Sequence, residues 1–200
     1  MKKPIIEEII GREWEMFSNV SNAGGRAACQ LDPVTFGIMR RSQAVGWPED
    51  LLESYREDLA VAQRDGRNLM SEKYARMMES TVPREYAAIA DRLPGIDGET
   101  LRLIEEIVAI NVQWKEEAAD RYPILNSRGR PIHAKNDTAY ATSFETYLKG
   151  ELKTYSPTTI RLLHKHTLDM KKNGLNEIEA NLLNQVKQYG YASLNEAEGV

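Results

Sequence analysis

Apolar residues recur every three or four positions along most of the chain, which is the spacing of amphipathic α-helices. The first such stripe runs from Ile5 to Val20 and ends near Gly24 and Gly25, where glycine suits a helix end. Taken together, the stripes predict nine helices. They span about residues 5–20, 33–46, 51–66, 69–81, 83–93, 99–120, 139–155, 157–173 and 176–189.

Several helix ends are marked by particular residues. Asp32 followed by Pro33 is typical of an N-cap and a first helical turn. Asn176 with Glu179 resembles a capping box at the start of the last long helix. Gly150 lies inside an aromatic-rich helix, where glycine costs about 1 kcal/mol relative to alanine. A close backbone contact at this position would explain the glycine.

Two segments lack a helical period. Residues 122–137 are punctuated by turn formers such as Pro123 and Gly129, so we expect a basic loop there. Residues 191–200 also lack a period and are expected to form a loose C-terminal tail. We expect residues 1–190 to form a single all-α domain of eight or nine short-to-medium helices. The pattern favours an irregular bundle with orthogonal and antiparallel helices.

Length and composition fit one soluble globular domain. The chain has 200 residues, of which 42% are hydrophobic, and no apolar run approaches the roughly 18 residues that a membrane span needs. Glu7 and Glu8 stand where a signal peptide would continue its apolar stretch, so we expect a cytoplasmic protein without a membrane association. The single cysteine, Cys29, excludes an internal disulfide framework and any all-cysteine metal site.

The charge balance argues against binding to nucleic acid. The chain carries 26 Lys and Arg against 30 Asp and Glu, a formal net charge of −4. The hairpin near the C-terminus resembles a helix-turn-helix, but its second helix opens with Glu177 and Glu179, which would meet DNA phosphates unfavourably. His164 and His166 are two positions apart and point away from each other on a helix, so we predict no metal site. The sequence indicates no particular cofactor.

Local basic zones leave protein interaction open as an alternative function. Residues 121–136 and 149–172 are rich in Lys and Arg, and each is either a contact site or a solvated face offset by acids elsewhere. A protein partner would dock on the basic loop or on the methionine-bearing helix with Met70, Met77 and Met78. The oligomeric state is left open by the sequence.

The segment NAGGRAACQ, residues 22–30, is atypical of a simple helix bundle. Successive backbone N–H groups at Gly24 and Gly25 could converge on an anion, with Arg26 adding a bidentate contact. The alternative is a helix C-cap followed by a tight turn. Cys29 is a candidate nucleophile if a nearby base lowers its pKa, or otherwise a small buried hydrophobe.

The aromatic-rich helix combines tyrosines and carboxylates. Its face with Tyr140, Tyr147 and Glu151 could line a pocket that holds an acid poised for proton transfer, or could simply be core. An enzyme hypothesis therefore assigns the general base to Glu145 or Glu151 and expects a carboxyl group with a raised pKa.

Three segments together resemble an uncharacterised family of bacterial helical domains of unknown function. They are NAGGRAACQ, TFGIMRRSQ and TSFETYLKGELKTYS. The resemblance covers most of the chain and implies a bacterial, cytoplasmic helical domain in which these segments come together. It also implies a nucleotidyltransferase-like partner, and hence a nucleotide or acyl-phosphate theme. It transfers no catalytic residue.

The leading hypothesis is a pocket between helices that binds a small anionic molecule, either a carboxylate or a phosphate. Polar and charged residues crowd into otherwise amphipathic helices, and arginine would hold the anionic group. The predicted lining residues are Arg26, Cys29, Gln30, Arg40, Gln43, Glu145, Tyr147 and Glu151.

Overall fold

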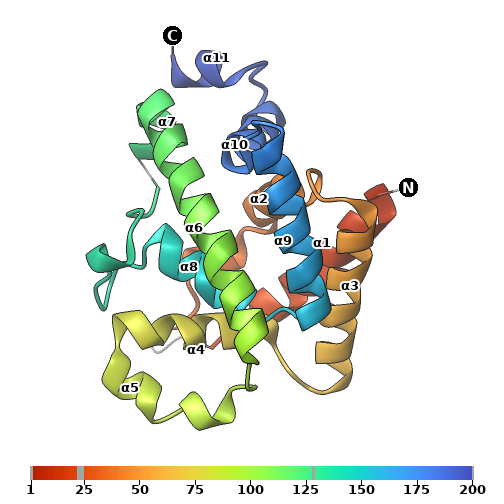
Figure 1. The fold of residues 1–200 in the computed structure, drawn as a ribbon, viewed down its shortest axis with the longest axis vertical. Coiled ribbons are helices and arrows are strands. Elements are labelled where there is room, and N and C mark those ends of the chain that lie inside the picture. Colours follow the sequence, from red (N-terminus) through yellow and green to blue (C-terminus); the bar gives the residue numbers. More distant parts are fainter. Residues whose placement is uncertain (1, 22–24, 128, 200) are drawn as a thin grey trace.

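The structure is a computed structural model that describes residues 2–21, 25–127 and 129–199 (Figure 1). Over these ranges the chain is helical, and its one extended pairing is an isolated antiparallel bridge between Thr138 and Ala141. The α-helices are α1 (Lys2–Ser18), α2 (Pro33–Ala44), α3 (Glu49–Arg64), α4 (Leu69–Thr81), α5 (Pro83–Ala87), α6 (Gly98–Arg121), α7 (Pro123–Ser127), α8 (Phe144–Leu152), α9 (Pro157–Lys172), α10 (Glu177–Gln188) and α11 (Leu194–Glu198). Short 3-10 helices are η1 (Ala28–Leu31), η2 (Ala90–Arg92) and η3 (Ala134–Asn136).

The longer helices form one irregular bundle, which confirms the predicted all-α fold. Helix α6 runs along most of the molecule and packs against α9, α8, α10 and α7 (Figure 1). Around it, α1 packs on α3, α4 on α8, and α2 on α10. The nine predicted spans correspond to α1–α6 and α8–α10, with different ends in places. No helix of the described residues is long and apolar enough to cross a bilayer.

The core is centred on α3 and α6. Leu51, Leu52 and Leu59 of α3 are completely inaccessible to solvent, and so is Ile104 of α6. Burying a side chain of this size stabilises the fold by about 1.5–3 kcal/mol relative to leaving it exposed. Because these residues follow the helical period in the sequence, the apolar pattern alone was sufficient to locate this part of the core.

The predicted capping residues at two helix starts are confirmed. The Asp32 side chain accepts a hydrogen bond of 2.9 Å from the backbone N–H of Thr35, and Pro33 is the first residue of α2. The Asn176 side chain likewise accepts a bond of 3.1 Å from the backbone N–H of Glu179 at the start of α10. Each cap satisfies a donor that the helix itself leaves unpaired, which contributes about 1 kcal/mol.

The close contact expected at Gly150 is also present. A Cβ atom at this position would lie 2.8 Å from Cγ of Met77 and 3.1 Å from the backbone carbonyl oxygen of Lys73. Both residues belong to α4, which packs directly against α8. Glycine therefore allows these two helices to approach more closely than any other residue would.

The predicted start of the aromatic-rich helix at residue 139 is wrong, because α8 begins at Phe144. The Asp137 carboxylate accepts a hydrogen bond of 2.5 Å from the backbone N–H of Ser143, and the Ser143 side chain caps α8. These bonds hold the preceding residues in a turn outside the helix. Tyr140 is consequently fully exposed, so it lines no pocket.

The expected basic loop and loose tail are both corrected. Residues 122–137 contain α7 and η3, and Pro123 is the first residue of α7 rather than a helix breaker. The last residues form α11, whose Leu194 side chain is buried. The Glu198 carboxylate accepts backbone hydrogen bonds from Ile124 at 2.6 Å and from Leu125 at 2.8 Å. This contact fastens the end of the described chain to the start of α7.

Residues 82–97 connect α4 to α6 and bury none of their side chains. The helix predicted over residues 83–93 is split into α5 and η2. In Figure 1 this segment extends from the lower edge of the bundle. The segment is fastened near its far end by Arg76, which donates a hydrogen bond of 2.7 Å to the carbonyl oxygen of Pro94.

Candidate functional site

The residues predicted to line one pocket lie in two separate parts of the molecule. Arg40, Gln43 and Glu151 meet in the core, where α2 faces α8. Arg26, Cys29 and Gln30 instead follow α1 in the chain; the Gln30 side chain donates to the carbonyl oxygens of Phe17 and Val20. The structure thus brings the second and third family motifs into direct contact.

Arg40 is the centre of a buried ionic network. Its Nε atom donates to Glu13 at 2.7 Å, and its Nη2 atom donates to the same carboxylate. Its Nη1 atom donates to Glu151 at 2.9 Å and to Gln43 at 3.1 Å. Tyr55 donates a further bond of 2.6 Å to Glu13. Since every nitrogen of Arg40 already has a protein acceptor, this guanidinium has a structural role in the described chain.

Glu151 also binds Lys73, whose Nζ atom lies 2.5 Å from its Oε2 atom and 3.4 Å from the ring centre of Tyr147. Burial alone would raise the pKa of Glu151, but the positive charges of Arg40 and Lys73 outweigh it and hold this pKa well below its usual range. Glu151 is therefore a carboxylate that serves as an ion-pair partner. The raised pKa that a general base at this position would need is absent.

The remaining predicted residues have local contacts. Glu145 accepts a backbone hydrogen bond of 2.7 Å from Ala134 and ties η3 to α8. Arg26 donates a bond of 3.3 Å to the carbonyl oxygen of Ser18, and Cys29 is exposed. Residues 22–24, which include one glycine of the expected anion-binding turn, lie outside the described residues.

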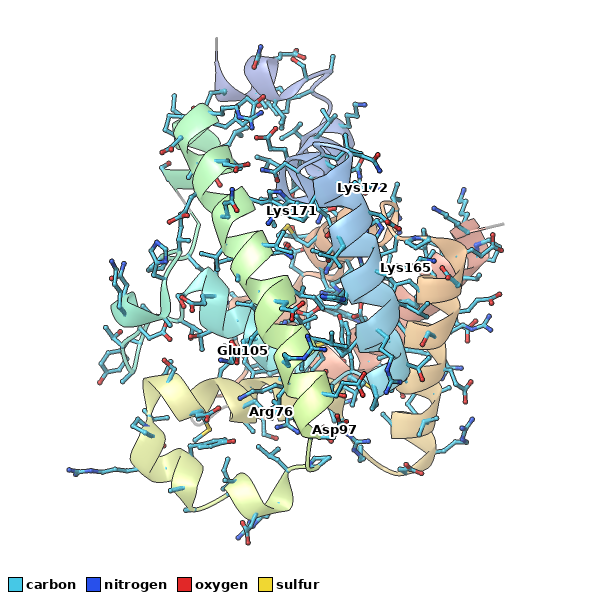
Figure 2. The ribbon with its side chains drawn as sticks, in the orientation of Figure 1. Arg76, Asp97, Glu105, Lys165, Lys171 and Lys172 are labelled. Carbon is cyan, nitrogen blue, oxygen red and sulfur yellow. The ribbon has the colours of Figure 1, made fainter. Side chains whose placement is uncertain are left out.

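The segments expected to dock a partner differ in how far their side chains are exposed. Of the three methionines of the methionine-bearing helix, Met70 and Met77 are buried, whereas Met78 is half-buried. Figure 2 shows Lys165, Lys171 and Lys172 on the outer side of α9, where they are solvated.

A cleft of about 310 Å³ lies where α3 ends and where α4, α6 and α9 begin. In Figure 2 the labelled Arg76 and Asp97 mark this end of the molecule. The residues that line it are Asp58, Val61, Arg67, Leu69, Arg76, Pro94, Gly95, Ile96, Asp97, Thr100, Lys153, Thr154, Tyr155, Ser156 and Pro157. The cleft thus lies between four helices, and its volume is at the lower end of the range of about 300–1,000 Å³ for small-molecule sites.

Arg76 is the unusual residue of this cleft. It is only 7% exposed, and its Nη2 atom donates to Pro94. Its Nε atom is buried and has no hydrogen-bond partner in the described part of the chain. Burial lowers the pKa of this guanidinium, and the nearby carboxylates of Glu72 and Glu79 oppose this effect only in part. A buried donor without an acceptor costs about 1–3 kcal/mol, and a charged one more, so the chain holds Arg76 in the cleft wall at a cost in stability.

The other cations of the cleft already have carboxylate partners. Arg67 donates through Nε and Nη2 to both oxygens of Glu72, at 2.8 Å each. Lys153 donates a bond of 2.7 Å to Glu79. Among the described cations that line the cleft, Arg76 is therefore the one without a paired carboxylate.

Three helix starts also face the cleft and add positive potential. Leu69 is the first residue of α4, Thr100 lies in the first turn of α6, and Pro157 begins α9. The N-terminus of a helix carries a partial positive charge of about half an elementary unit, which attracts anions. The helix starts and Arg76 therefore both favour the binding of an anion.

Asp58 of α3 is an acidic residue that lines the same cleft. It is half-buried and accepts a hydrogen bond of 3.0 Å from the backbone N–H of Ser156. Burial raises its pKa, although hydrogen bonds from Thr159 and Ser156 oppose this effect. The cleft thus combines an unpaired guanidinium with a partly desolvated carboxylate, and both can make charge-assisted hydrogen bonds to a ligand.

Comparison with known proteins agrees with the resemblance seen in the three motifs. Residues 3–199 match the family described as "Protein of unknown function (DUF4125)". The chain belongs to this family. No curated protein and no solved structure matches the chain.

In this DUF4125 chain, no group of three or more His, Cys, Asp or Glu residues among those described is placed to hold a metal ion. The cleft between α3, α4, α6 and α9 does gather several polar side chains, and Arg76 and Asp58 are among them. Neither residue was among the predicted site residues.

A signal for Arg76 was nevertheless present in the sequence. The buried stripe of α4 is Leu69, Met70, Lys73, Arg76 and Met77. Lys73 and Arg76 follow Leu69 by four and seven positions, so both fall on the apolar face of the DUF4125 helix. Charged residues on a buried helical face usually have a structural or functional role, because the cost of burying them must be compensated by a partner.

Proposed function

We propose that the protein binds a small anion, a carboxylate or a phosphate, in the cleft between α3, α4, α6 and α9. The observation that carries this proposal is that Arg76 lines the cleft and, within the described chain, forms no ion pair with a carboxylate. An anionic oxygen would complete the hydrogen bonding of this guanidinium, and the three nearby helix starts would add to the attraction. The proposal moves the expected anion site from Arg26 and Arg40 to Arg76.

The test is calorimetric titration of the purified chain with inorganic phosphate and, separately, with 4-methylpentanoate. We expect at least one of these anions to bind and to raise the melting temperature. The variant Arg76→Gln should weaken this binding by about 10-fold to 100-fold, because a hydrogen bond to a charged group contributes about 1.5–3 kcal/mol.

Arg84→Gln is the matched control, because Arg84 is exposed on α5 and lies outside the cleft lining. This variant should bind as the wild type does. Failure of both anions to bind the wild type, or equal binding by Arg76→Gln, would contradict the proposed function.

We propose a cytoplasmic location for this binding. The exposed thiol of Cys29 supports it, since a free surface cysteine stays reduced in the cytosol and is oxidised readily elsewhere. Fractionation of the source cells, followed by immunodetection of the chain, tests this location.

A further inference from the structure

The cleft contains carboxylates as well as cations, and this restricts the ligand beyond the requirement for an anion. Arg67 is paired with Glu72, and Lys153 is paired with Glu79. Once these pairs are set aside, the charged side chains that line the cleft are Arg76, Asp58 and Asp97. A ligand that is only anionic would be attracted by Arg76 but would also be repelled by these carboxylates.

Asp97 has little capacity left for a ligand. Its Oδ1 atom accepts the backbone N–H of Thr100 at 2.9 Å, and its Oδ2 atom accepts the hydroxyl of the same residue at 2.7 Å. The residue is exposed, so water competes for any further contact. Its role at the start of α6 is that of an N-cap.

Asp58 differs from Asp97 because it is half-buried and lies on the α3 wall. Arg67 lies within electrostatic range of Asp58 but binds Glu72 with two hydrogen bonds. In the described part of the chain, Asp58 forms no ion pair within 4.0 Å. A cationic group in the cleft would therefore supply the partner that this carboxylate lacks, since a carboxylate offers about four acceptor sites.

Part of the cleft wall is apolar. Val61 of α3, Leu69 of α4 and Ile96 before α6 contribute aliphatic side chains to its walls. A cleft of about 310 Å³ is small, and it suits one compact molecule better than a nucleotide. The ligand should therefore carry an aliphatic group beside its charges.

We propose that the cleft binds a free amino acid with an aliphatic side chain, whose carboxylate contacts Arg76 and whose ammonium group contacts Asp58. This proposal rests on the proposed function, because it uses the same anion contact at Arg76. It adds a second charged group and an apolar group to the ligand. Each charged group of the ligand is then paired with a side chain of opposite charge in the cleft.

The experiment compares three related probes by calorimetry on the wild-type chain. L-leucine carries both charges, 4-methylpentanoate lacks the ammonium group, and 3-methylbutylamine lacks the carboxylate. We expect L-leucine to bind at least 10-fold more tightly than either of the other two. Because this comparison needs no variant, it does not depend on whether a substitution disturbs folding.

The variant Asp58→Asn gives a second, independent readout. Its side-chain oxygen can still accept the backbone N–H of Ser156, so the start of α9 keeps its contact. We expect this variant to lose the advantage of L-leucine over 4-methylpentanoate and to bind 4-methylpentanoate as well as the wild type or better. The control Asp97→Asn should keep the advantage.

The outcomes separate this inference from the proposed function. If 4-methylpentanoate or phosphate binds through Arg76 and L-leucine binds no more tightly, the amino-acid proposal is overturned and anion binding stands. If none of the four compounds binds, both proposals fail. If L-leucine keeps its full advantage in a folded Asp58→Asn variant, the ammonium contact is not at Asp58 and the proposal as stated is wrong.

Discussion

Lys73 of α4 and Glu151 of α8 form a buried ion pair in which Nζ lies 2.5 Å from Oε2. Both side chains are at most 5% exposed, and the same carboxylate also binds Arg40 of α2. With Glu13 of α1, this network contains two cations and two carboxylates, so its charges cancel in the core. Such a network specifies how four helices meet, because each charge is tolerated only beside its partner.

Removing one partner of this pair should be strongly destabilising. Lys73→Met leaves Glu151 with fewer compensating charges, and breaking a buried pair in this way costs about 3–5 kcal/mol. Urea unfolding followed by circular dichroism measures the change. Lys149→Met is the control, because Lys149 pairs with Glu105 on the surface, where such pairs contribute about 0–1 kcal/mol. Equal losses in the two variants would contradict the structural role of the network.

The lowered pKa of Glu151 predicts a loss of stability in acid. In the folded chain this pKa lies below the unfolded value of about 4.3, so the ionised form stabilises the fold at any pH above that value. This contribution is lost as the pH falls below about 4 toward the folded pKa. Urea midpoints measured between pH 7 and pH 3 should fall more steeply for the wild type than for Glu151→Gln. If the urea midpoints of the two proteins fell in parallel with pH, the pKa of Glu151 would be the same in the folded and unfolded chains, and the prediction would be wrong.

Two glycine substitutions should have opposite effects on stability. Gly150→Ala places a Cβ atom against Met77 and the backbone of Lys73, and overpacking of this kind costs about 1–3 kcal/mol. Gly11 lies in α1, where an added Cβ atom would point into open space, so Gly11→Ala should stabilise the helix by about 0.5–1 kcal/mol. Thermal unfolding of both variants provides the measurement. A stable Gly150→Ala variant would show that α4 and α8 can separate without penalty.

The contact between Glu198 and the start of α7 can be tested at single amides. Glu198→Ala removes the acceptor of the Ile124 and Leu125 backbone N–H groups, a loss comparable to that of a helix cap, about 0.5–2 kcal/mol. Hydrogen exchange at these two amides should become several-fold faster. Asn195→Ala, an exposed position on the same short helix, should leave their exchange unchanged.

The parts of the fold that depend on neighbouring residues were predictable, whereas those that depend on distant contacts were not. The Asp32 cap and the α3 stripe follow from residues within a few positions of each other. In contrast, α11 is fastened by Glu198 to a backbone segment more than 70 residues away. The same reason explains why the pocket expected around Arg40 is filled, since its partners Glu13 and Glu151 come from other helices.

The segment 82–97 contributes part of the cleft wall while burying none of its own side chains. Its apolar side chains are at most half-buried, so displacing this segment exposes less apolar surface than separating two helices of the buried core, such as α1 and α3. Arg76 donates a hydrogen bond to this segment at Pro94 and also lines the cleft in which we place the ligand. A ligand that binds the Arg76 guanidinium would therefore also influence the position of segment 82–97, because the same side chain holds that segment at Pro94.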